Sequence, residues 1–233
     1  MTRDQLIANV ALRMDEITPD NGLPQIEVDG SDNNPLYALI DGLIEAGALE
    51  LFSVAPFWRL KQTEFSDVVV EALPTIFNNA DGSAKFVIRL KVPDDFLRVA
   101  EISCTGFQRP ITEVVPEQSA EGRRQHNRWL IAKEARPVGV ISHGVWTSGV
   151  TSSQCREIDC YSLSSIVQTS EVSATYIAKP ADGIGASPSA VEDNIPAILI
   201  PALEWLIAAR VFGARGDVNH AQVCQQNAQN LLV

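Results

Sequence analysis

Residue types that could form a nucleophilic site occur together between positions 142 and 159. Ser142 or Cys155 could serve as the nucleophile, with His143 as the base and Asp159 as its orienting partner, because such triads are assembled in space. No spacing among these residues favours the arrangement, and no G-x-S-x-G motif surrounds a serine. We therefore expect that the protein is not an enzyme.

The segment Asp182–Ser187 stands between an expected strand and an expected helix, where a dinucleotide-binding turn would lie. It contains Gly183 and Gly185, but position 188 is proline, so the third glycine is missing. The chain before it also has the pattern of antiparallel strands. We interpret residues 181–189 as a linker and expect no nucleotide cofactor.

Metal-ligating residues are few and scattered. The adjacent Asp94 and Asp95 follow Pro93 and point apart in an extended chain, so they are interpreted as turn residues. The cysteines are expected to be buried or inert thiols, and no metal site is expected. No recognised ligand spacing joins the four cysteines and three histidines, which are Cys104, Cys155, Cys160, Cys224, His126, His143 and His220.

The chain of 233 residues is strongly acidic, with 29 Asp and Glu against 18 Lys and Arg and a net charge of −11. Such a protein is a poor general binder of nucleic acid, although it could line a passage to which DNA must not adhere. A chain of this length can bury roughly 70% of the surface that its unfolded form exposes, so it does not need disulfide bonds or a bound metal for stability. The first twenty residues contain charges and no continuous apolar core, so no secretory signal is expected and folding in a cytoplasm is predicted.

Two helices are predicted near the N-terminus, at Thr2–Glu16 and Asn34–Leu51. The segment Asp20–Asn33 between them is rich in Asp, Asn, Gly and Pro and is predicted to be a loop, with room for a short extended piece. Gly42 and Gly47 lie within the second helix, where a glycine makes the free energy of helix formation about 1 kcal/mol less favourable than an alanine does. They therefore indicate close approach of another helix.

The C-terminal part predicts a hairpin of two helices, Ile195–Ala214 and Asp217–Val233. The first helix is apolar on most of its faces, which predicts that it is buried. Pro201 is expected to bend it. Glu204 and Arg210 interrupt its apolar run, so no membrane span is expected.

The outer face of the second helix is polar but uncharged, because five glutamine and asparagine side chains occupy it. This composition suits packing against another protein, while an ordinary solvated surface helix is the open alternative. The apolar tail Leu231, Leu232 and Val233 is expected to dock against a partner or an adjacent subunit.

From Val54 to Pro180 the apolar period changes to two, which predicts a β portion. Asn78 to Gly82 supply the left-handed positions that a hairpin turn needs, so the first two strands are predicted to pair antiparallel. Short strands bounded by Gly, Pro and Ser indicate a sandwich or a barrel. The predicted strands are 67–73, 85–92, 99–104, 111–115, 129–132, 138–141, 157–163 and 173–178.

Two stretches of the β portion are interpreted as mobile loops that contact a partner. Glu117–Arg128 carries Arg123, Arg124 and Arg128, which could meet an acidic neighbour or a phosphate backbone. The other stretch, His143–Gln154, is rich in Gly, Ser and Thr around Trp146. Tryptophan anchors many interfaces, so an exposed Trp146 would form a recognition surface. A solvated charged loop is the competing interpretation of the first stretch.

These patterns predict an α+β fold. A helical bundle is expected from residues 1–52 and 190–233, formed by two N-terminal helices and the C-terminal hairpin. An antiparallel β-sandwich or barrel-like portion is inserted at residues 53–180, and residues 181–189 form the linker.

The order of elements resembles that of the head-to-tail connector proteins of tailed bacteriophages, including tail tubular adaptors of short-tailed phages and ring proteins of crAss-like phages. The resemblance spans the chain, and its most specific pieces are Thr2–Val10, Val92–Val99, Tyr176–Pro180 and Pro196–Ala228. The long polar loop and the large β insert depart from the usual pattern.

The resemblance implies a structural virion protein without cofactors, located at the head-tail junction after assembly in the host cytoplasm. It implies a ring of about twelve subunits that meets the portal protein and other tail or ring proteins, through which double-stranded DNA passes without sequence-specific binding. An acidic wall agrees with such a channel, because it repels phosphates. The alternative is a soluble carbohydrate- or protein-binding β module with helical flanks, which uses Trp146 for recognition.

Overall fold

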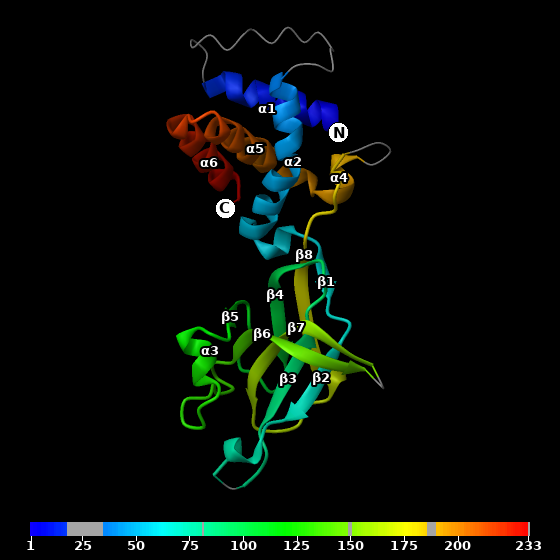
Figure 1. Ribbon diagram of the computed structural model, residues 1–233, viewed down its shortest axis with the longest axis vertical. Coiled ribbons are helices and arrows are strands. Elements are labelled where there is room, and N and C mark those ends of the chain that lie inside the picture. The colour runs from blue at the N-terminus through cyan, green and yellow to red at the C-terminus, as the bar shows by residue number, and fades with distance from the viewer. Residues whose placement is uncertain (18–34, 81, 149–150, 186–189, 233) are drawn as a thin grey trace. The chain divides into compact units, whose positions relative to one another are not determined.

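A computed structural model describes residues 1–17, 35–80, 82–148, 151–185 and 190–232 of the chain. The protein has an α+β fold, as predicted (Figure 1). Two compact units are present: a helical unit, Met1–Lys61 with Lys179–Val233, and a β unit, Gln62–Ala178. The predicted loop Asp20–Asn33 lies outside the described residues.

The helical unit is organised around α5 (Ile200–Ala214), which contacts α1, α2 and α6. Eleven of its fifteen residues are buried, because the helix is apolar on almost every side. By length and composition the 18 residues Ala197–Ala214, with a mean hydropathy of 1.7, could cross a membrane, so Glu204 and Arg210 do not exclude a span, contrary to expectation. In the structure 67% of this stretch is buried within the protein. The other elements are α1 (Arg3–Ile17), α2 (Pro35–Val54), η1 (Phe57–Arg59), α4 (Val191–Asn194), η4 (Ala197–Leu199) and α6 (Val218–Leu232).

The prediction that Pro201 bends a helix from Ile195 to Ala214 is wrong. Pro201 lies in the first turn of α5, where its missing N–H leaves no helix hydrogen bond unmade. The chain before it forms α4 and η4 instead, with Pro196 preceding η4. The proline therefore starts the buried helix rather than deforming it.

The turn between α5 and α6 is formed by a glycine in the left-handed conformation. Gly216 has a φ of 80°, and its N–H donates to the Gly213 carbonyl at 3.0 Å. The next N–H, from Asp217, donates to the Phe212 carbonyl at 2.9 Å, which completes a Schellman motif. The Asp217 carboxylate then accepts from the His220 N–H at 3.2 Å and caps α6.

The two glycines of α2 have different environments. A Cβ on Gly47 would lie 2.7 Å from Cγ1 of Ile207 in α5, so a side chain there requires Ile207 to shift. A Cβ on Gly42 would meet nothing within 4 Å. The predicted close approach of a helix is therefore confirmed at Gly47 and wrong at Gly42.

A charged side chain within α5 is satisfied by α1. Glu204 is 4% exposed, and its two carboxylate oxygens accept from Nδ2 of Asn9 at 2.9 Å and from Nε of Arg13 at 3.2 Å. The Arg13 guanidinium also lies 5.4 Å from the ring centre of Trp205. Both partners are needed, because a buried carboxylate without them would be strongly unfavourable.

The β unit contains a three-stranded sheet of order β1-β8-β4 and a five-stranded sheet of order β2-β3-β7-β6-β5. Neighbouring strands are antiparallel except β5 and β6, which are parallel and depart from the all-antiparallel prediction. The strands are β1 (Gln62–Glu64), β2 (Val68–Ala72), β3 (Phe86–Lys91), β4 (Phe96–Cys104), β5 (Val114–Pro116), β6 (Val138–Ser148), β7 (Thr151–Leu163) and β8 (Val172–Ala178).

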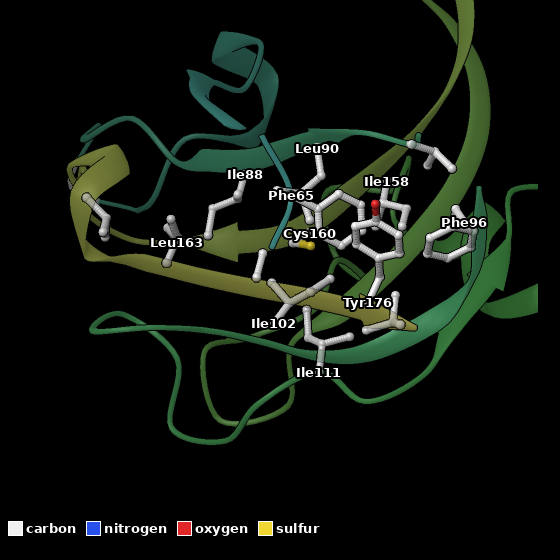
Figure 2. Close-up of a cluster of buried hydrophobic side chains, with 14 residues drawn as sticks. Phe65, Ile88, Leu90, Phe96, Ile102, Ile111, Ile158, Cys160, Leu163 and Tyr176 are labelled. Carbon is white, nitrogen blue, oxygen red and sulfur yellow. The ribbon is translucent and has the colours of Figure 1, made fainter. Parts of the chain in front are cut away.

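The main core of the β unit is formed by buried side chains from both sheets (Figure 2). Ile88 and Ile158 come from the five-stranded sheet, and Ile102 and Tyr176 come from the three-stranded sheet. Figure 2 shows Phe65, Phe96 and Tyr176 grouped in this core, and the rings of Phe65 and Tyr176 are 4.9 Å apart between centroids. A β-sandwich accounts for this arrangement.

A second, smaller cluster contains residues of the five-stranded sheet and of the segment that follows α3 (Ala120–Arg124). Ile131, from that segment, packs with Val140 and Tyr161 of the sheet and is 6% exposed. The cluster fixes the segment that carries the candidate surface described below.

Several predicted β and loop assignments are wrong. Residues 129–132 form a turn and its exit rather than a strand. Of the predicted strand 111–115, the structure retains a single bridge between Ile102 and Ile111 and the short β5. The predicted loop His143–Gln154 belongs to the β6–β7 hairpin, because Val, Thr and Trp favour paired strands despite the Gly and Ser between them.

Candidate interaction surfaces

The register of β6 and β7 separates the candidate catalytic residues. Ser142 of β6 is paired with Glu157 of β7, and paired residues point to the same face of the sheet. Cys155 and Asp159 are each two residues from Glu157 along β7, so they lie on that same face. His143 lies on the other face, because successive strand residues point to opposite sides. The structure therefore does not bring this set together as a triad.

The cysteines of the described ranges are free thiols. Burial raises the pKa of the Cys160 thiol, and it raises the pKa of Cys224 to about 12, so both are protonated at neutral pH. Within the residues that the structure describes, no group of three or more His, Cys, Asp or Glu side chains could hold a metal ion.

Trp146 is not available as a recognition residue. It lies in β6, and only 8% of it is exposed. The exposed tryptophans are elsewhere: Trp129 is 83% exposed in the β unit, and Trp58 is 69% exposed in the helical unit. The recognition surface expected from the Trp146 stretch is therefore not present at that residue.

A basic surface surrounds Trp129, and we call it the arginine–tryptophan surface. Residues 117–136 contain five Lys and Arg residues but three Glu residues, whereas the chain has a net charge of −11. All five cationic residues are exposed, and none of them forms an ion pair with a residue in the described ranges. The surface consists of Arg123, Arg124, Arg128, Trp129, Leu130, Lys133 and Arg136.

The helix α3 is held close to β5 at the start of this surface. The Ser119 hydroxyl accepts from the Gly122 N–H at 2.9 Å and caps the helix. A Cβ on Gly122 would lie 2.4 Å from the Pro116 carbonyl oxygen, so only glycine permits this approach. The stretch predicted as a mobile loop, Glu117–Arg128, thus contains a capped helix that presents Arg123 and Arg124.

The segment after α3 is fixed by amide side chains. Gln125 is 3% exposed; its Nε2 donates to the Glu121 carbonyl at 3.1 Å, and its Oε1 accepts from the Ala132 N–H at 2.8 Å. Oδ1 of Asn127 accepts from the Trp129 N–H at 2.9 Å. Because these bonds define the turn, Trp129 is held in an exposed position before any partner arrives.

The exposed indole has a cation beside it and a hollow close by in the chain. The Arg128 guanidinium lies 5.1 Å from the ring centre of Trp129. The hollow has a volume of about 380 Å³ and includes both cationic and apolar side chains. One carboxylate, that of Glu121, lines it as well, and the other lining residues are Arg124, Gln125, Leu130, Ala132, Lys133, Ala135, Arg136 and Val138.

A second candidate surface lies on the exposed side of α6, which we call the amide face. The helix contains no Asp, Glu, Lys or Arg between Val218 and Leu232, although 20% of the chain is charged. Cys224, Ala228 and Leu232 are buried and attach the helix to its unit. The amide face consists of the exposed residues Asn219, Gln222, Val223, Gln225, Gln226, Gln229 and Asn230.

The three residues of the predicted docking tail are placed differently. Leu231 is 43% exposed, and its carbonyl accepts from Nη1 of Arg59 at 3.0 Å. Leu232 is 7% exposed and packs within the helical unit, so it is not available to a partner. Val233 lies outside the described residues.

Sequence reasoning found three of the arginines but missed Trp129, Lys133 and Arg136. The apolar run from Trp129 to Ala132 predicts a strand, whereas only Ile131 of that run is buried. The signal that could have revealed the surface is the tryptophan that directly follows Arg128 within a stretch holding five Lys and Arg residues against three Glu residues. No protein-family model and no curated protein sequence matches the chain.

Proposed function

We propose that the protein is a head-to-tail connector of a tailed bacteriophage, a structural protein that assembles into a ring between portal and tail. In this proposal the ring has about twelve subunits, lies at the head-tail junction of the virion, and meets the portal and other tail proteins. The observation that carries the proposal is the amide face of α6.

Charged side chains and amide side chains differ in the free-energy cost of their burial. Moving an unpaired charged side chain out of water is far more costly than moving an amide that finds a hydrogen-bonding partner. The buried centres of protein interfaces are accordingly depleted in charged residues. An exposed helix face with several amides, one valine and no charge is therefore suited to burial in an assembly, and a solvated face has no comparable need to exclude charge.

The net charge supports the passage of DNA. At −11 per subunit, a ring of many copies would repel phosphates, so double-stranded DNA would pass through without adhering. The net negative charge of the chain thus fits a channel through which DNA passes better than it fits a nucleic-acid-binding protein.

Adding charge to the amide face is expected to prevent assembly. Gln222 and Gln229 are exposed on α6, and the variant Gln222→Glu with Gln229→Glu introduces two carboxylates two helical turns apart. Desolvating them should abolish co-sedimentation with the portal protein from the same genome. The measurement is sedimentation velocity of the chain alone and mixed with that portal protein.

The control places the same charges on the β unit. Gln108 and Gln118 are both exposed, so Gln108→Glu with Gln118→Glu changes the net charge equally without touching α6. This control should co-sediment with the portal as the unmodified chain does. If the α6 variant also co-sediments normally, the amide face is not the contact and the proposal loses its main support.

A further inference from the structure

We propose that the arginine–tryptophan surface binds the acidic segment 18–34 of a second copy of this chain. The proposal goes beyond the connector function, because it identifies a contact between copies that requires no portal protein. It is carried by the unpaired cations of the surface, by the fixed and exposed indole of Trp129, and by the composition of the segment.

The cations are arranged to meet an acidic polypeptide. Arg124, Lys133 and Arg136 line the hollow of about 380 Å³ together with a single carboxylate, that of Glu121, and within the described part of the chain none of the three forms an ion pair. Unpaired guanidinium groups bind carboxylates with two parallel hydrogen bonds, which gives both affinity and orientation. The surface is therefore a set of unused donors in a protein with an excess of carboxylates.

The segment 18–34 has the complementary composition. It carries four carboxylates and no Lys, Arg or His, and it joins α1 to α2. Apolar residues stand between the acidic ones, and these could enter the hollow beside Leu130 and Val138. The acidic residues are Asp20, Glu27, Asp29 and Asp32, and the apolar ones are Leu23, Ile26 and Val28.

Trp129 and Arg128 form the anchor of the proposed contact. Tryptophan and arginine are the residues that most often dominate the binding energy of protein interfaces. Trp129 is 83% exposed although its turn is fixed by Asn127 and Gln125, so little conformational freedom remains to be lost on binding.

Nucleic acid is the other ligand class that could use arginine and tryptophan, through phosphate contacts and base stacking. The observations favour polypeptide, because the local excess of cations is small and the chain as a whole is strongly negative. An exposed leucine, Leu130, next to the indole also favours an apolar side chain over a stacked base.

The first test uses a labelled synthetic peptide of residues 18–34 and fluorescence anisotropy. The receptor is the full chain with Asp20, Glu27, Asp29 and Asp32 replaced by Asn or Gln, which we call the neutral-segment variant, so that its own segment does not compete. We expect binding that weakens by about tenfold or more when Trp129→Ala is added. Trp58→Ala, which removes an exposed tryptophan of the helical unit, should leave binding unchanged.

Three outcomes of this test would overturn the proposal. They are absence of peptide binding, equal binding with and without Trp129→Ala, and equal binding of a peptide whose four acidic residues are neutral. Tighter binding of an oligothymidine than of the peptide at the same salt concentration would assign the surface to nucleic acid instead.

The second test distinguishes a second copy from the same copy by sedimentation at several concentrations. Trp129→Ala and the neutral-segment variant should each reduce self-association, and a mixture of the two should form heterodimers that do not grow further. Self-association that neither variant changes would contradict a contact between copies. Because no portal protein is present, failure of the connector proposal would not affect either readout.

Discussion

Replacing Arg89 with methionine is expected to lower the free energy of unfolding of the β unit by about 3–5 kcal/mol, the range for removing one partner of a buried ion pair. Arg89 is the cation of a network on one face of the five-stranded sheet, and methionine retains much of its apolar stem. Urea-induced unfolding followed by circular dichroism measures the loss, and hydrogen exchange of β3 and β7 locates it.

The size of this effect follows from the contacts of Arg89. Its Nε and Nη2 donate to the two carboxylate oxygens of Asp159 at 2.8 and 3.3 Å, and its Nη1 donates to Glu71 at 3.0 Å. Nε also lies 3.6 Å from Oε2 of Glu157. Glu157 and Asp159 are each 8% exposed, so the variant would leave two nearly buried carboxylates without a cation.

The loss should depend on pH in a defined direction. Burial raises the pKa of Glu157, because its charged form is desolvated and Arg89 only partly offsets this. A carboxyl whose pKa is higher in the folded state destabilises the fold as pH rises through that pKa. Without Arg89 this penalty grows, so the deficit of the variant should be largest at neutral pH and shrink on acidification.

A second substitution tests whether charge is the cause. Adding Glu157→Gln to Arg89→Met removes one of the uncompensated carboxylates and should restore part of the lost stability at neutral pH. If the double variant is no more stable than Arg89→Met, or if the deficit does not change with pH, packing rather than charge explains the effect.

The second large effect is expected in the helical unit. Gly47→Leu should lower the free energy of unfolding by about 1–3 kcal/mol or more, the range for overpacking a filled core. The Cβ alone would lie 2.7 Å from Cγ1 of Ile207, which is fully buried and has little room to move. Urea-induced unfolding measures the change, and hydrogen exchange of α2 and α5 should show faster opening.

The matched control lies in the same helix. Gly42 is exposed and a Cβ there meets nothing, so Gly42→Leu should stabilise the helix by about 1 kcal/mol through helix propensity alone. Opposite signs at positions 42 and 47 are the expected result. Similar effects of the two substitutions would contradict the close approach of α2 and α5.

The sequence predicted those parts of the fold that local chemistry decides. Thr2 and Gln5 have the spacing of a capping box and form one, in which the Thr2 N–H donates to Oε1 of Gln5 at 2.9 Å. Strands β2 and β3 pair antiparallel as predicted. Among the described residues of 78–82, however, only Gly82 has a positive φ, of 84°, whereas Asn78 has a φ of −51°, and the connection also contains η2 (Thr75–Phe77), so the predicted left-handed turn is wrong apart from Gly82. The burial of α5 is confirmed as well, because eleven of its fifteen residues are buried.

The parts that sequence reasoning missed depend on distant packing. The run after Arg128 is apolar, but only Ile131 is buried in the cluster around Tyr161, with Ala132 partly buried against it, and Trp129 stays in solvent. Trp146 shows the reverse: its Gly- and Ser-rich surroundings indicated a loop, whereas pairing with β7 buries it. Local pattern cannot show which of two tryptophans a tertiary contact will cover.

The measurement that tests the connector proposal most directly is sedimentation of the unmodified chain with the portal protein from the same genome. The proposal predicts one large complex that contains both proteins. A chain that remains monomeric and separate from the portal across the concentration range would contradict the proposed function.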